Sequence, residues 1–188
     1  MARIIPENKY LTDKSEKWVV NKLKNDGSPE DWILLPNLIL RSLDERKKEG
    51  IFDLKKHSET EIDSVLLVPG RGIVLIEIKS HRDISIGDDG TWYEFSNISF
   101  KKNKKRDPIE QTTRHRELLK NRIPAHLGIK LHQIYAFICL PRQVLSINEN
   151  AEFGKNRIID KSALNERSIA EIISQELPES DPLFSNIV

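Results

Sequence analysis

The sequence predicts an α/β domain in which a mixed central sheet is flanked by helices. Its periodic segments follow one another as helix, several strands, helix, strand and helix, an order that suits a sheet covered by helices. The 188 residues are 38% hydrophobic and 31% charged, which is typical of a globular chain with a sizeable core. We therefore expect a single domain over residues 1–188.

A first helix is predicted over residues 12–26. Thr12 or Asp13 can cap its N-terminus, and Gly27 lies just past its end. An apolar stripe that includes Val20 supplies the face that packs on the sheet.

Strands are predicted on both sides of a charged segment. Residues 32–43 form an apolar run, in which Pro36 implies an edge position or a bulge. The charged, patternless residues 44–60 indicate an exposed loop. Residues 61–68 and 73–80 are two further strands, joined by the turn Pro-Gly-Arg-Gly.

The second half of the chain completes the sheet and its helices. We expect short strands near residues 84–86 and 91–96 that continue the sheet. Asp107 and the Pro that follows it mark the start of a helix that runs to about residue 122. The remaining elements are a buried strand, a short strand and an amphipathic helix, over residues 133–140, 157–160 and 163–176.

The hairpin over residues 61–80 carries three charges inside an apolar ribbon, EIDSVLLVPGRGIVLIEIKS. Glu77 and Lys79 share one face of their strand, because strand side chains alternate. A salt bridge between strands on a solvated face is one interpretation. The flanking segments VLLV and IVLI argue against it, since apolar residues on both faces are typical of a central strand.

The turn decides whether Asp63 joins Glu77. If Val68 pairs with Gly72 across a three-residue loop, Asp63 lies opposite Glu77; if Pro69 pairs with Gly72, it faces away. The two glycines of the turn suit a positive φ, so the first register is available. Two carboxylates about 5 Å apart at Cβ would repel each other without a cation between them. Oxygen ligands favour Mg²⁺ or Mn²⁺, and Lys79 would then orient a water or stabilise charge on a phosphate.

These residues resemble a known family. An Asp on one strand, a turn and Glu-x-Lys on the next strand is similar to the core of the PD-(D/E)XK nuclease superfamily, and in particular to the nuclease-related domain, NERD. Two further matches are SEKWV around Glu16 and DPIEQTTRH around Gln111, so the resemblance covers roughly residues 12–125. The chain departs from the family in having Asp107 where Asn is common, and in its charged loop before the hairpin.

The resemblance implies a restriction-endonuclease-like fold and Mg²⁺-dependent hydrolysis of DNA, with RNA as an alternative substrate. Metal would be held by Asp63, Glu77 and the carbonyl of Ile78. Lys79 would act on the water or on the transition-state charge, and Glu16 and Gln111 would support the site. A module that keeps the fold but only binds nucleic acid or protein is the alternative.

Nucleic acid would contact the densest basic run of the chain, for which a solvated loop is the alternative. Neutralised phosphates would supply the affinity that a net charge of only +1 does not. The predicted contacts are Lys101, Lys102, Lys104, Lys105 and Arg106, with Arg114 and His115 on the following helix. Nearby aromatic residues such as Trp92 are expected in the core rather than stacked on bases, and Cys139 is expected to be a buried thiol.

The sequence also bears on location and partners. No apolar run approaches the ~20 residues that span a bilayer, and the N-terminus lacks the apolar stretch of a signal peptide, so we expect a cytoplasmic protein without membrane association. The abrupt end after LFSNIV suggests the N-terminal module of a longer protein. The resemblance implies a helicase or kinase-like partner module and a role in DNA repair or phage defence. The oligomeric state is left open.

Overall fold

The computed structural model describes residues 2–6, 11, 13–41, 59–80, 84–87, 91–96, 101–104, 107–124, 133–145 and 158–178. The predicted loop at 44–60 lies almost entirely outside these ranges, and its last two residues already belong to a strand.

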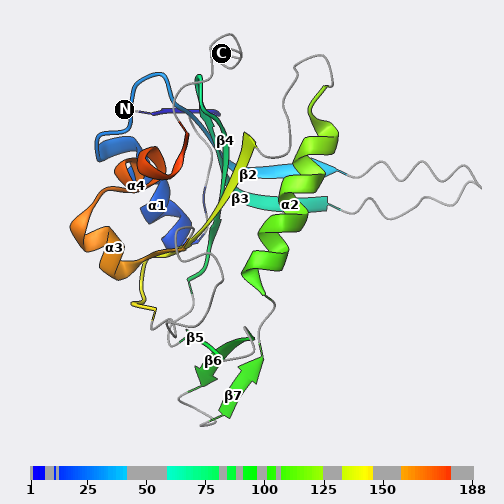
Figure 1. The fold of residues 1–188 in the computed structure, drawn as a ribbon, viewed down its shortest axis with the longest axis vertical. Helices are drawn as coiled ribbons and strands as arrows, with labels where there is room; N and C mark the ends of the chain where they lie inside the picture. Colours follow the sequence, from blue (N-terminus) through cyan, green and yellow to red (C-terminus); the bar gives the residue numbers. More distant parts are fainter. Residues whose placement is uncertain are drawn as a thin grey trace, which may run out of the picture.

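A six-stranded mixed sheet forms the centre of the molecule (Figure 1). Its order is β1-β2-β3-β4-β8-β9, with antiparallel pairing between β2, β3 and β4 and parallel pairing elsewhere. The strands are β1 (Arg3–Ile4), β2 (Ile33–Arg41), β3 (Glu59–Val68), β4 (Gly72–Ile78), β8 (Ile134–Leu140) and β9 (Ile158–Asp160). The predicted α/β class is thus confirmed, and β1 is an addition that the sequence did not suggest.

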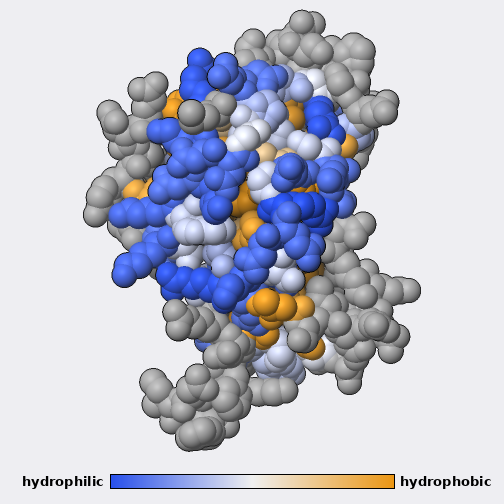
Figure 2. Space-filling view, turned by 90° about the vertical axis from the view of Figure 1, so that its left-hand side faces the viewer, coloured by the Kyte–Doolittle hydropathy of each residue, from blue (hydrophilic) through white to orange (hydrophobic). Residues whose placement is uncertain are grey.

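Helices cover both faces of this sheet. Helices α1 (Lys14–Asn25), α3 (Lys161–Glu166) and α4 (Ile169–Glu176) lie on one face, and α2 (Pro108–Arg122) lies on the other (Figure 1). Asp13 caps α1 and Asp107 caps α2, each through its side chain, as predicted. The face that carries α1, α3 and α4 is largely hydrophilic on its outer surface (Figure 2).

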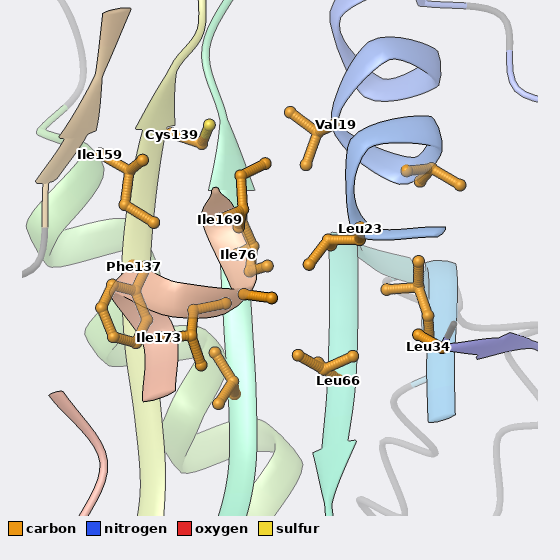
Figure 3. Packing of buried hydrophobic residues seen from close by; sticks show 14 of the residues in the cluster. Val19, Leu23, Leu34, Leu66, Ile76, Phe137, Cys139, Ile159, Ile169 and Ile173 are labelled. Carbon is orange, nitrogen blue, oxygen red and sulfur yellow. The ribbon is translucent and has the colours of Figure 1, made fainter. Parts of the chain in front are cut away.

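The main core lies between the sheet and the helix pair α1 and α4. Val19 and Leu23 of α1 and Ile169 of α4 point toward Leu66 of β3 and Ile76 of β4 (Figure 3). Every residue of β4 is buried, as expected for a central strand between β3 and β8. Cys139 belongs to the same cluster, and burial raises the pKa of its thiol to about 12.

The β3–β4 hairpin has the three-residue loop that the glycines allow. Val68 pairs with Gly72, and the register then runs without a break to Ser64 and Ile76. Gly70 and Gly72 have φ values of 71° and 133°, which are costly for residues with a Cβ. If this register is continued by one residue beyond Ser64 and Ile76, Asp63 lies across from Glu77.

Arg71, in the same turn, ties the hairpin to the end of α4. Its guanidinium donates hydrogen bonds to the carbonyl oxygens of Ser174 (2.5 Å), Leu177 (2.6 Å) and Pro178 (2.9 Å). These include carbonyls at the end of the helix, which have no partner within it. Arg71 therefore caps α4 from a turn more than 100 residues earlier in the chain.

The side chains of β2 and β3 change faces halfway along the strands. Leu34 packs with the α1 and α4 core, and its neighbour Leu35 packs with α2; beyond the middle of the strand, Leu38 and Leu40 both pack with the α2 cluster. Strict alternation from Leu34 would place Leu38 and Leu40 on the same face as Leu34, toward α1 and α4. The change falls at Asn37, whose φ of 48° lies outside the extended region and interrupts the alternation of side chains.

Pro36 is tolerated because β1 pairs only with Ile33 and Leu34. From Leu35 onward, β2 has no second partner among the described strands, so the missing N–H of Pro36 breaks no ladder on that side. The edge interpretation of Pro36 therefore fits the described strands.

The prediction that residues 84–86 and 91–96 continue the central sheet is wrong. β5 (Ile84–Ile86), β6 (Trp92–Ser96) and β7 (Lys101–Lys104) form a separate antiparallel sheet (Figure 1). The reason is that β3 and β8 occupy both edges of β4, which leaves no edge for β5. Trp92 is a core residue as predicted, at 1% exposure, in a cluster with Ile138 and Leu140 of β8.

The predicted last helix over residues 163–176 is two helices. Asp160 caps α3 by accepting from the Ala163 N–H, so α3 begins earlier than expected. Ser168 then breaks the helical run and forms a capping box with Glu171 at the start of α4.

Candidate active site

Glu77 is the centre of the site and is almost fully buried, with 2% exposure. It lies near the end of β4, below the first turns of α2. Lys79 Nζ is 2.5 Å from Glu77 Oε1, and the Gln111 side-chain amide donates to the same oxygen. Lys79 also donates to Gln111 Oε1 at 3.2 Å, so the three side chains form a closed triangle of hydrogen bonds.

Local structure places each member of this triangle. Strand alternation puts Glu77 and Lys79 on the face that α2 covers. The Lys79 N–H donates to the Cys139 carbonyl at 2.9 Å, which continues the pairing of β4 with β8 to this residue. The cap at Asp107 starts α2 so that Gln111 falls in its first turns, directly above the end of β4.

Asp63 stands beside this triangle. Its Oδ2 accepts a hydrogen bond of 2.6 Å from the Ile78 N–H, where the backbone pairing between β3 and β4 has ended. Burial and the nearby Glu77 charge raise the Asp63 pKa to about 7, although Ile78 and Lys79 act in the other direction. The sequence-predicted Asp63, Glu77 and Lys79 are therefore together in the fold.

His115 is the fourth group around Glu77. It was predicted as a nucleic-acid contact, but it is buried at 5% exposure, with Nδ1 3.4 Å from Glu77 Oε2. This separation is long for a hydrogen bond, and neither atom has a hydrogen-bond partner among the described residues. Burial would raise the Glu77 pKa, but His115 and Lys79 outweigh it, and the pKa is lowered.

Glu16 reaches the site from the first turn of α1. Its pKa is raised, mainly by burial and further by acidic neighbours that include Glu77, while a hydrogen bond from the Asn37 side chain opposes the rise. Sequence reasoning missed Asn37. The signal available was an Asn inside an apolar strand, since Asn tolerates a positive φ better than most residues.

The residues present fit a hard divalent cation. Asp63, Glu77 and the Ile78 carbonyl supply oxygen donors, and the buried Glu77 Oε2 lacks a hydrogen bond among the described residues. Burial and, after it, the Glu77 charge raise the Asp63 pKa, and a bound cation would offset both effects. In the described ranges there is no cluster of three or more His, Cys, Asp or Glu side chains suited to a metal.

The predicted nucleic-acid contacts fall in three places. Arg114 is exposed on α2, one turn after Gln111. Lys101, Lys102 and Lys104 lie in β7 of the small sheet, where the backbone pairs Lys104 with Tyr93. Lys105 and Arg106 lie outside the described residues.

Fold and site together define an α/β protein with an Asp/Glu-x-Lys site at the end of β4, where its pairing with β3 stops. The family model of the nuclease-related domain, NERD, matches residues 12–141 of the chain. This chain therefore belongs to the NERD family, as its sequence suggested. No curated protein and no solved structure matches it. Over the part of the chain that the structure describes, no helix has the length and apolar character to cross a membrane.

Proposed function

We propose that this domain is a Mg²⁺- or Mn²⁺-dependent nuclease that hydrolyses phosphodiester bonds of DNA. The observation that carries the proposal is the meeting of Asp63, Glu77, Lys79 and Gln111 at the end of β4. A salt bridge alone needs one carboxylate and one cation. Here a second carboxylate, Asp63, lies beside the Lys79–Glu77 pair and is held by the Ile78 N–H rather than by a cation of its own.

Asp63 and Glu77, with the Ile78 carbonyl, would hold the divalent ion. Such an ion supplies Lewis-acid polarisation of a phosphoryl oxygen and makes a water molecule more acidic. Asp63 is oriented by the Ile78 N–H, and Glu77 is held through Oε1 by Lys79 and Gln111, which leaves its Oε2 for a cation.

Lys79 is placed to act on the reacting groups. Its side chain is 20% exposed, whereas Glu77 beneath it is 2% exposed, so the ammonium lies between the buried carboxylate and solvent. From there it can donate to an attacking water or to a phosphate oxygen while it keeps its contact with Glu77. Gln111 holds Lys79 on one side and Glu77 on the other, which fixes the distance between them.

DNA would approach across α2 and the small sheet. Strand β7 comes shortly before α2 in the chain, so its lysines precede the helix that carries Gln111 and the exposed Arg114. The predicted contacts on these two elements would neutralise phosphates of the bound nucleic acid.

Cleavage of linear duplex, circular and single-stranded DNA in Mg²⁺ or Mn²⁺ tests the proposal. We expect metal-dependent cutting that EDTA abolishes and that falls at least 100-fold in Lys79→Ala, because the variant loses a preorganised cation at the developing charge. Lys24→Ala, an exposed lysine at the far end of α1, serves as the control for loss of a surface charge.

Two results would count against the proposal. Cutting that survives in Lys79→Ala at the wild-type rate would place the chemistry elsewhere. A folded wild-type protein that neither cuts nor binds Mn²⁺ by calorimetry would make the domain a binding module with the nuclease fold. RNA in the same assay decides between the two nucleic acids.

A further inference from the structure

The irregular centre of β2 lies directly beside the site. Asn37 is the one non-glycine residue with a positive φ among the described residues. The β2–β3 pairs run Pro36 with Ser64 and Leu38 with Ile62, so the position across from Asn37 is Asp63, and this pair is missing from the ladder. The break in the ladder and the site carboxylate thus occur at the same level of the sheet.

The Asn37 side chain connects this break to α1. Its amide hydrogen-bonds to the Glu16 carboxylate. Glu16 is surrounded by negative charge, because Asp13, Glu61 and Glu77 all act on it electrostatically, and it acts in turn on Asp63. In this acidic group the Asn37 amide is a neutral donor that stabilises the ionised form of Glu16.

We propose that Asn37 is a positioning residue of the site, which holds the Glu16 carboxylate beside Asp63 and Glu77. The position makes two demands. Its φ of 48° suits Gly, Asn and Asp, and its contact with Glu16 requires a donor. Gly has no side-chain donor, and an ionised Asp would repel Glu16, so Asn is the residue that meets both demands. The role of Asn37 in catalysis rests on the proposed nuclease function, whereas its hydrogen bond to Glu16 does not.

The contact can be tested without any activity. In ¹H–¹⁵N spectra, the side-chain NH₂ signals of Asn37 are assigned as those lost in Asn37→Gly. We expect these signals to move in Glu16→Gln, which keeps the size of the side chain and removes its charge, and to stay in place in Lys24→Ala. Signals that do not respond to Glu16→Gln would overturn the proposal, whether or not the protein cuts DNA.

A double-mutant cycle then tests the role in catalysis. Asn37→Gly keeps the backbone conformation, so we expect kcat to fall about tenfold, the effect of losing one hydrogen bond to a charged group, with little change in KM for DNA. Asn37→Asp should lower kcat further, because an ionised Asp would repel Glu16. Asn37→Ala, which also strains the backbone, separates the conformational effect from the loss of the amide.

The Glu16→Ala background gives the decisive comparison, because Ala, unlike Gln, has no oxygen that can accept from the Asn37 amide. If Asn37 acts through Glu16, Asn37→Gly has no further effect on kcat once Glu16 is changed. Multiplicative losses would show a general structural effect and overturn the proposal. An inactive wild-type protein would refute the nuclease function, and the NMR experiment would still decide whether Asn37 holds Glu16.

Discussion

Asp63→Asn is expected to stabilise the metal-free protein at neutral and alkaline pH. Asp63 is a carboxylate that the fold holds in an unfavourable environment, next to Glu77 and largely out of water. Asn keeps an oxygen that accepts from the Ile78 N–H and removes the negative charge. The variant should therefore lose the proposed metal site and gain stability.

The magnitude follows from the Asp63 pKa. The folded protein binds this proton more tightly than the unfolded chain, because the pKa rises from 3.8 to about 7. Well below pH 3.8 the group is protonated in both states and costs nothing. Between pH 3.8 and about 7 the unfolded chain loses this proton while the folded protein still holds it, so stability falls, by roughly 4 kcal/mol in all at 1.36 kcal/mol for each pKa unit.

Urea denaturation of both proteins in EDTA, from pH 4 to pH 9, measures this difference. We expect the two free energies of unfolding to be similar near pH 4 and the variant to be about 2–4 kcal/mol more stable at pH 8. Mg²⁺ should stabilise the wild type and leave Asp63→Asn unchanged, because a ligand of the folded state raises its stability.

Asp31→Asn is the matched control, since Asp31 is exposed. It should change stability by less than about 0.5 kcal/mol at any pH in this range. A difference between Asp63→Asn and the wild type that is constant between pH 4 and pH 8 would refute the reasoning, because the effect would then not come from the titration of Asp63.

Three further substitutions test the fold, each by its urea midpoint. Gly72→Ala should destabilise the protein by about 3 kcal/mol, because its Cβ would lie 2.5 Å from the Gln133 carbonyl oxygen and the residue has a φ of 133°. Its control is Gly27→Ala, which has a φ of 79° but no atom within 4 Å of the added Cβ, and this change should cost only about 1 kcal/mol. Arg71→Ala should cost about 2–3 kcal/mol, since the last carbonyls of α4 lose their donor; an unchanged midpoint would mean that water replaces the guanidinium. Ser168→Ala should cost about 1 kcal/mol through loss of the capping box, and an effect near zero would show that packing alone starts α4.

Local chemistry made much of the fold predictable. Asp13 and Asp107 were identified as caps from residues within one helical turn, and both caps are present. The glycines of the turn allowed the register in which Val68 pairs with Gly72, and the structure has this one of the two alternatives, which brings Asp63 to Glu77. The ends of helices and tight turns depend on few residues, so their signals can be recognised in the sequence.

Features that depend on distant partners could not be predicted in this way. The short strands after the hairpin form a separate sheet because β8, much later in the chain, takes the remaining edge of β4. His115 looked like a surface residue, yet the packing of α2 on the sheet buries it against Glu77. The division between α3 and α4 did have a local signal, Ser168 followed three residues later by Glu171, which the apolar pattern of the segment obscured.

The change of faces at Asn37 has a consequence for how the family can vary in length. Since β2 and β3 switch faces at the same level, removing Asn37 alone would leave Leu38 and Leu40 facing α2 but would shift their pairing with β3 by one residue. Removing Asn37 and Asp63 together would restore a regular hairpin and an apolar core, but without the carboxylate. Insertions and deletions in these two strands should therefore occur in pairs, and a paired loss should mark relatives that have kept the fold and given up the chemistry.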